Sequence, residues 1–230
     1  MEKNKTGKYF KYAIGEIVLV VVGILIALQI NNWNESKKEG RLEQQLIGLL
    51  ISDLQEKNKE NLSDSKSIKN LIKRIQNTVN IWELNSTIDT VGLKRTLRTL
   101  GDDTIFQNEN SPVYNGLSNS NLWKQLPDSL TKQIDDIYRI KLMRVKKAFE
   151  KTSEYGTYCK LNFLVPNNLV DLDQKNEKIH EKVSRLDEEF ISYVKLLINT
   201  STRLNSTLEN SASSIDKLIG SLESYNDKLN

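Results

Sequence analysis

Residues 12–33, YAIGEIVLVVVGILIALQINNW, form an apolar run near the N-terminus of the 230-residue chain. Between Ala13 and Ile30 only Glu16 and Gln29 are strongly polar. Together with its aromatic margins the run makes a helix of about 31 Å, at 1.5 Å per residue, which matches the hydrocarbon thickness of a bilayer. The sequence therefore predicts one transmembrane helix over residues 12–33.

Aromatic residues flank this run, as they do at the two surfaces of a bilayer. They are Tyr9, Phe10 and Tyr12 on the N-terminal side and Trp33 on the other. A cleaved signal peptide is the alternative interpretation, but residues 29–33 do not supply the small-x-small cleavage site that such a peptide needs. We therefore expect the chain to stay anchored in lipid.

Positive charge is slightly greater before the span than after it. The preceding lysines are Lys3, Lys5, Lys8 and Lys11, and the basic residues that follow within a similar distance are Lys37, Lys38 and Arg41. Because Lys and Arg favour the cytoplasmic side, we expect residues 1–11 to form a short cytoplasmic tail and residues 34–230 to lie outside. The bias is small, so a cytoplasmic C-terminal domain stays open as an alternative.

The run GEIVLVVVGILIALQINNWNE at residues 15–35, preceded by KYFKYAI at residues 8–14, carries a resemblance. It is similar to the N-terminal signature of a family of single-span membrane proteins of unknown function that is common in Bacteroidota, especially flavobacteria. Residues 114–118, YNGLS, resemble the interior of that family more loosely. The resemblance implies a Gram-negative inner-membrane setting and a helical domain beyond the span; together with the lysine bias, this setting predicts a periplasmic location for residues 34–230. The resemblance implies no activity.

Glu16 shares one helix face with small residues. At 100° per residue it lies within about 20° of Gly23 and Ala27, and Gly15 and Leu19 continue the same ridge. Small residues four apart let membrane helices approach closely, so we expect the span to self-associate along this stripe. The Glu16 carboxylate should then be satisfied at the interface or by a partner; the alternative is that it couples protons or ions.

Formal charge argues against a nucleic-acid surface. The chain carries 33 basic and 30 acidic residues, a net charge of +3. Residues 1–12 contribute +3 and Glu16 contributes −1, which leaves +1 for the remainder. We therefore expect membrane lipid and either a second copy or another membrane protein as partners, with no nucleic acid and no small-molecule substrate.

With one cysteine and one histidine, the chain can supply few of the residues that metal sites and catalytic sites need. A zinc cluster, a dithiol or a Ser-His-Asp triad needs more of these residues, so we expect no enzyme, no cofactor and no metal ion. Cys159 is expected to be a partly buried free thiol, with an intermolecular disulfide as the alternative. His180 is expected on a solvated face.

The remainder of the chain is rich in Leu and Ile and contains few helix breakers, with three prolines and ten glycines in the whole sequence. We expect an all-α fold in which the membrane helix continues into an elongated antiparallel bundle with coiled-coil-like seams. The expected helices span about residues 35–84, 90–101, 127–155 and 173–229, with short turns over 114–126 and a connection from Gly156 through Pro166.

Apolar residues recur at helical spacing in the first and last of these helices. The first seam is Ile68, Ile72, Ile75, Val79 and Trp82. The last begins with Val183, Leu186, Phe190, Tyr193 and Leu197, and continues after a shift through Leu204, Leu208, Ser211, Ile215, Leu218, Leu222, Tyr225 and Leu229. A seven-residue repeat of this kind is typical of helices that pack along their length.

Two polar features interrupt these patterns. Asn58, Asn61 and Ser65 interrupt the apolar pattern before the first seam, which indicates a solvated neck near the membrane, a polar layer that sets register or a locally frayed helix. The middle helix carries a basic run, interpreted as a solvated face or as a patch for lipid headgroups or an acidic partner. The run consists of Arg139, Lys141, Arg144, Lys146 and Lys147.

These observations favour a single-pass membrane protein whose helical domain serves as a scaffold or interaction module, with itself or in a membrane complex. The alternative function is a proton- or ion-coupled energiser or transport accessory subunit that uses Glu16 within the span. No nucleophile, base and metal constellation supports catalysis.

Overall fold

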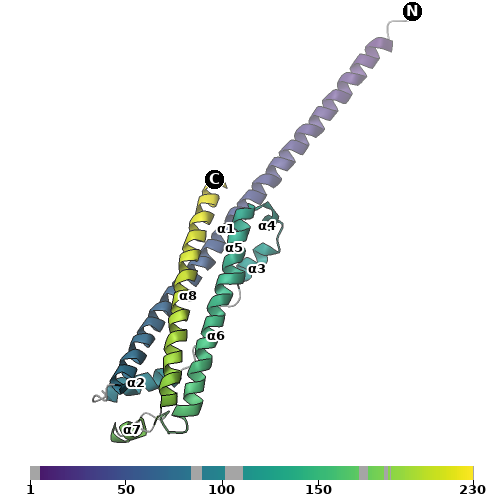
Figure 1. The fold of residues 1–230 in the computed structure, drawn as a ribbon. Coiled ribbons are helices and arrows are strands. Elements are labelled where there is room, and N and C mark those ends of the chain that lie inside the picture. Colours follow the sequence, from purple (N-terminus) through teal and green to yellow (C-terminus); the bar gives the residue numbers. More distant parts are fainter. Residues whose placement is uncertain are drawn as a thin grey trace, which may run out of the picture.

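The computed structural model describes residues 6–83, 90–101, 111–170, 176–183, 186 and 188–229, and at residues 6–14 and some other helical positions it describes the backbone alone. Within these ranges the chain is helical and contains no strand. One long N-terminal helix extends away from a bundle of packed helices (Figure 1). The all-α prediction is confirmed.

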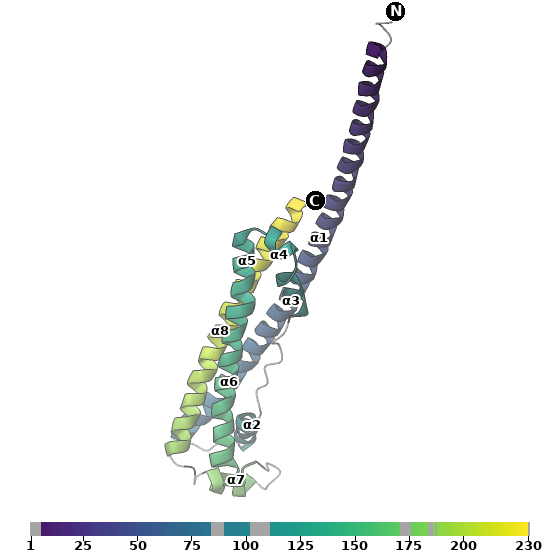
Figure 2. The same cartoon turned by 90° about the vertical axis from the view of Figure 1, so that its right-hand side faces the viewer.

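Helix α1, Thr6–Glu83, runs unbroken for 78 residues. Its first part stands clear of the other helices in both views (Figure 2). An 18-residue window in this part has a mean hydropathy of 1.8, and none of its residues is buried. Its apolar side chains lie 47–75% exposed from Ile17 to Ile30, whereas Ile47 is completely buried. A single helix therefore carries both an unpartnered apolar segment and one wall of the bundle.

Three long segments build the bundle: the second part of α1, the middle segment from α5 to η2, and α8. Helix α8 runs antiparallel to the other two (Figure 1). The remaining helices cover the ends, with α3 and α4 on the side toward the free part of α1 and α2 and α7 at the far end. In chain order these elements are α2 Thr90–Gly101, α3 Pro112–Ser118, α4 Leu122–Gln125, α5 Asp128–Asp135, η1 Asp136–Lys141, α6 Leu142–Cys159, η2 Lys160–Leu164, α7 Asn176–Val183, α8 Glu188–Asn226 and η3 Asp227–Leu229.

Buried apolar side chains form two separate clusters along the bundle. The proximal core, nearer the free part of α1, joins α1, α3, α4, α5, η1 and α8 through residues such as Ile47, Leu54, Leu117, Ile134 and Ile215. The distal core joins α1, α2, α6, α7 and α8 and includes Ile75, Leu97, Phe149, Phe190 and Leu204. The predicted seam positions of α8 from Leu204 to Leu222 are buried, which confirms the spacing that the sequence shows.

The expected turn at Gly156 is wrong. Helix α6 passes through this residue, η2 continues to Leu164, and the chain turns only at Val165–Asn168, where Asn168 adopts a φ of 50°. Glycine costs about 1 kcal/mol in a helix relative to alanine. That cost is outweighed here because the added turns bury Cys159, Phe163 and Leu164 in the distal core.

The expected single helix over residues 173–229 is also wrong. The structure divides it into α7 and α8, with Leu186 outside both helices. The Leu186 amide donates a hydrogen bond to the carbonyl of Val183, the last residue of α7. Leu186 is nevertheless buried, so its place in the apolar repeat reflects packing and carries no information about helix continuity.

Candidate functional site

The residues of the predicted membrane stripe lie on the free part of α1. Gly15, Glu16, Leu19, Gly23 and Ala27 are all exposed, and Leu19 has 75% of its surface accessible. A Cβ atom added at Gly15 or Gly23 would meet no atom within 4 Å. The stripe is thus exposed in the single chain, and the packing of another helix along it stays a prediction.

The predicted interfacial residues are placed only in part. Trp33 is 60% exposed, and the ammonium of Lys37 lies 4.4 Å from the centre of its ring, a cation–π contact on consecutive turns of α1. The side chains of Tyr9, Phe10 and Tyr12 and of the lysines at positions 3, 5, 8 and 11 lie outside the described residues.

A polar belt separates the two cores where α1 crosses α8. Asn58 Nδ2 donates to Asp216 Oδ1 at 2.5 Å, Asn61 Nδ2 donates to Ser211 Oγ at 3.1 Å, and Ser65 Oγ donates to Asn205 Oδ1 at 2.8 Å. Asn58, Asn61 and Ser65 are all buried. Of the three interpretations of these residues, the polar layer is correct: the solvated neck is wrong because the side chains are buried, and the frayed helix is wrong because α1 is continuous here. On the outside of the same contact Lys69 forms an ion pair with Glu209.

A second polar network fastens the segment around α3 to the bundle. The Asp53 carboxylate on α1 accepts hydrogen bonds from Ser111 Oγ at 2.9 Å and from Tyr138 Oη at 2.5 Å. Burial, and then the bond to Asp53, raises the pKa of Tyr138 well above its ordinary value. The Tyr138 ring stacks on Tyr114 with 4.5 Å between centroids. This network joins α1, α3 and η1 at the proximal core.

The predicted basic run divides into two groups. Three of its members have acidic neighbours: Arg139 lies 3.4 Å from Asp135, Lys141 3.9 Å from Asp136, and Lys146 3.7 Å from Glu150. Arg144 and Lys147 form no ion pair with any residue that the structure describes. Neighbouring carboxylates thus pair with three cations of the run, whereas Arg144 and Lys147 have no such partner among the described residues.

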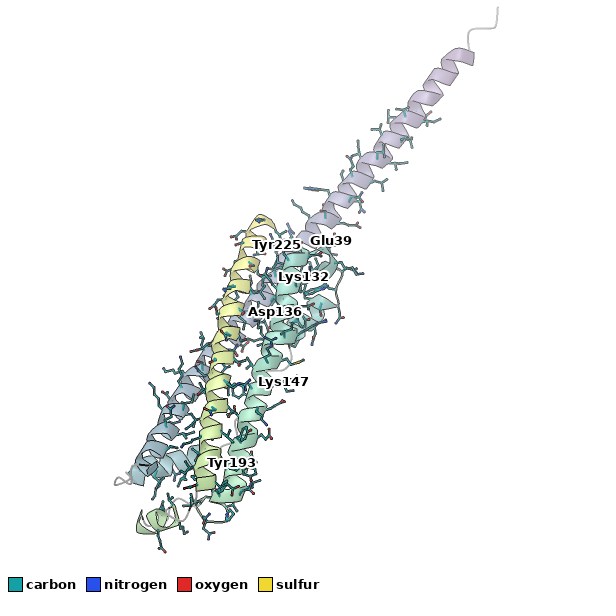
Figure 3. All side chains as sticks on the ribbon, in the orientation of Figure 1. Glu39, Lys132, Asp136, Lys147, Tyr193 and Tyr225 are labelled. Carbon is teal, nitrogen blue, oxygen red and sulfur yellow. The ribbon has the colours of Figure 1, made fainter. Side chains whose placement is uncertain are left out.

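Arg144 and Lys147 line a groove between α6 and α8, which we call the basic groove. Its volume is about 360 Å³, and its lining consists of Arg144, Lys147, Ala148, Lys151, Thr200, Arg203 and Thr207. Figure 3 labels Lys147 at the height where α8 passes beside α6. Arg203 likewise has no ion pair among the described residues, whereas Lys151 binds Glu154 at 2.8 Å. The groove therefore combines four cations from two helices with no carboxylate in its lining.

The basic groove lies far along α1 from the apolar segment. Asn205, two residues from Arg203, contacts Ser65 of α1, which places the groove at the level of Ser65. Ser65 is about 48 Å from Trp33 at 1.5 Å per residue.

Cys159 is a free thiol and is completely buried, where the sequence predicted partial burial. Its burial in the distal core raises the pKa of the thiol from 9.0 to about 11. His180 lies on α7, but its side chain is outside the described residues. Among the residues that are described, no three His, Cys, Asp or Glu side chains gather into a metal-binding group.

The structure defines an all-α protein in which a long apolar N-terminal helix continues into a bundle of packed helices. The chain belongs to a family of unknown function, DUF6090, whose model matches residues 16–150. The match includes most of α1, the segment around α3 and the first part of α6, while α8 lies beyond it. No curated protein and no solved structure matches the chain.

Sequence reasoning found half of the basic groove. Arg144 and Lys147 belong to the run that the pattern on the middle helix shows, but Arg203 lies in a Ser- and Thr-rich stretch with few other charges. Only the contact between α6 and α8 brings the two halves together. One sequence signal does point to the second half of the groove: Thr200, Arg203 and Thr207 are spaced so that they lie on one face of a helix over two turns.

Proposed function

We propose that the protein is a single-pass membrane-anchored helical interaction protein without enzymatic activity, in which α1 holds the bundle at a fixed distance from the bilayer. The observation that carries this proposal is the continuity of α1 from an exposed apolar segment into the buried wall of the bundle. Exposed side chains such as Leu19 and Leu25 are costly in water and favourable in lipid.

The contacts of α1 define a short stalk between membrane and bundle. Trp33 and its Lys37 partner suit a lipid–water interface, where aromatic and basic side chains concentrate. At the start of the bundle, Tyr225 Oη of α8 donates a hydrogen bond to Glu43 of α1 at 2.7 Å. The segment from Trp33 to Glu43 is about 15 Å long as a helix. Figure 3 shows Tyr225 and Glu39 close to the point where α1 leaves the bundle.

The proposed location is the inner membrane of a Gram-negative bacterium, with the N-terminus in the cytoplasm and the bundle in the periplasm. Its support is the small excess of lysine before the span. We propose that the exposed stripe of Gly15, Gly23 and Ala27 pairs with a second copy or with another membrane helix. The energiser alternative depends on Glu16, and no described contact favours it.

The anchor is tested by expressing the full chain in a Gram-negative host with a C-terminal tag. We expect the chain in the membrane fraction after alkaline carbonate extraction, with an intact mass near 26.4 kDa plus the tag. The control is Leu25→Arg at the centre of the span, where a charge costs about 2.5–3.5 kcal/mol on insertion scales and should reduce membrane retention. A soluble product shortened by the apolar segment would show a cleaved leader instead and would overturn the proposal.

The orientation of the chain in the membrane is tested by a separate experiment. Protease added to spheroplasts should remove the C-terminal tag if the bundle is periplasmic, while a cytoplasmic marker stays intact. A tag that is digested only after lysis would place the bundle in the cytoplasm and reverse the proposed topology, without affecting the anchor itself.

A further inference from the structure

The basic groove concentrates four cations, of which only Lys151 forms an ion pair with a described carboxylate. Arg144, Lys147 and Lys151 follow one another along about 10 Å of α6, and Arg203 faces them from α8. Unlike the ion-paired cations of the middle segment, Arg144, Lys147 and Arg203 have no acidic partner among the described residues. Like charges held together repel each other, so an anion bound between them would be stabilised by all of them.

The other lining groups narrow the kind of anion. Thr200 Oγ1 donates to the carbonyls of Leu196 and Leu197, and Thr207 Oγ1 donates to that of Arg203, so these hydroxyl protons are already used within α8. The small Ala148 side chain adds no polar group. The ligand must therefore be bound through the cations alone, and among the described lining residues no aromatic ring or amide is present to recognise a base.

From this arrangement we infer that the basic groove binds a compact soluble anion that carries two or more phosphate groups. Arg guanidinium groups bind phosphate oxygens in pairs, and Lys ammonium groups bind them as point charges. A volume of about 360 Å³ is at the lower end of small-molecule sites and suits a few linked phosphates.

Position favours a soluble ligand over the headgroups of the protein's own membrane. The groove lies about 48 Å along α1 from Trp33, and a tilt of about 40° would still leave it about 37 Å above that residue. The headgroup layer is only about 5–8 Å thick on each side of the hydrocarbon core. The binding of an anion goes beyond the proposed function and does not depend on it, whereas the choice of a soluble ligand over lipid headgroups rests on the proposed membrane anchor.

The test uses the full chain in neutral detergent micelles, with inorganic tripolyphosphate as the probe in isothermal titration at low ionic strength. We expect saturable binding at one site per chain that weakens as salt is added. The triple variant Arg144→Gln, Lys147→Gln, Arg203→Gln should weaken binding at least about tenfold, because it removes the three unpaired cations.

The matched control is the triple variant Lys141→Gln, Lys146→Gln, Lys217→Gln. It removes the same charge, two cations from the middle segment and one from α8, outside the groove, and its affinity should stay within about twofold of the parent chain. Circular dichroism of both variants checks that the helices are retained.

Four results would overturn the inference: no saturable binding at millimolar tripolyphosphate, an equal loss in the control variant, tighter binding of a polyglutamate peptide, or displacement of tripolyphosphate when the micelles are doped with phosphatidylglycerol. The last would assign the groove to lipid headgroups.

Discussion

Asn61 of α1 donates a hydrogen bond to Ser211 of α8 at 3.1 Å, although 150 residues separate them in sequence. Both side chains are almost completely buried, with 3% and 1% of their surfaces exposed. A slip of one helix by a turn would leave these groups buried without partners, at a cost of about 1–3 kcal/mol each. We therefore expect the polar belt to select the register in which α1 and α8 pack.

The first prediction concerns this pair. Asn61→Ala should lower the free energy of unfolding by about 1–3 kcal/mol, because the Ser211 hydroxyl loses its partner in a buried site. Chemical denaturation of the full chain in micelles measures the change. Asn70→Ala, on an exposed face of the same helix, should stay within about 0.5 kcal/mol.

A double-mutant cycle with Ser211→Ala separates the bond from other effects of the substitutions. If the two changes are additive, Asn61 and Ser211 do not interact and the belt does not set register through them.

The second prediction concerns Asp53. Asp53→Ala should destabilise the chain by about 2–4 kcal/mol, since the hydroxyls of Ser111 and Tyr138 both lose their acceptor. It should also shift the fluorescence of Trp123, whose ring lies edge-on to Tyr114 in the same network with 6.2 Å between centroids. Glu56→Ala, exposed on the same helix, is the control. Equal stability of the two variants would contradict a structural role for the Asp53 network.

The sequence could predict the helices because their apolar spacing is set by packing. Positions such as Leu204, Leu208 and Ile215 are buried where the repeat places them. It could not predict where a helix is interrupted, because Leu186 keeps its place in the apolar repeat although its backbone lies outside both α7 and α8. Nor could it pair Asn58 with Asp216, since 158 residues separate them and local patterns carry no information about such contacts.

The basic groove shows that prediction of the functional site from sequence is limited in the same way. A run of cations on one helix is visible in sequence, but the neighbours that neutralise them are decided by geometry. Lys146 has Glu150 one turn away, while Lys147 faces Arg203 across α6 and α8. Adjacent residues thus have opposite environments, and only the packed structure distinguishes them.

The third prediction concerns the pH dependence of Cys159. Burial raises the pKa of its thiol to about 11, from an ordinary value of 9.0, so at pH 8 the folded chain should react with a thiol reagent such as dithionitrobenzoate far more slowly than the urea-unfolded chain. The raised pKa favours the protonated thiol in the folded state. This contribution to stability is present below pH 9 and is lost as the pH rises through about 11.

Because the chain has one cysteine, the assay needs no control for other thiols. Rapid stoichiometric reaction of the folded chain at pH 8 would show that the distal core is open at this residue.

The fourth prediction concerns the membrane stripe. Gly23→Ile should weaken association of the span in crosslinking within membranes, because close approach of two helices at Gly23 needs a small residue. It should leave the bundle unchanged, since a Cβ at Gly23 meets no atom of its own chain within 4 Å. Val21→Ile, about 160° around the helix from Gly23, is the control. Association that is equally strong in all three chains would exclude this face as the contact.

The unbroken course of α1 also has a mechanical consequence. With the apolar segment anchored in lipid as we propose, the unbroken helix from Trp33 to Glu83 would act as a lever about 75 Å long that pivots at the membrane surface. A change of about 10° in the inclination of the span would swing the far end of the bundle through about 13 Å. Events within the bilayer, such as pairing of two spans or a change in its thickness, would thus be transmitted to the basic groove as large displacements.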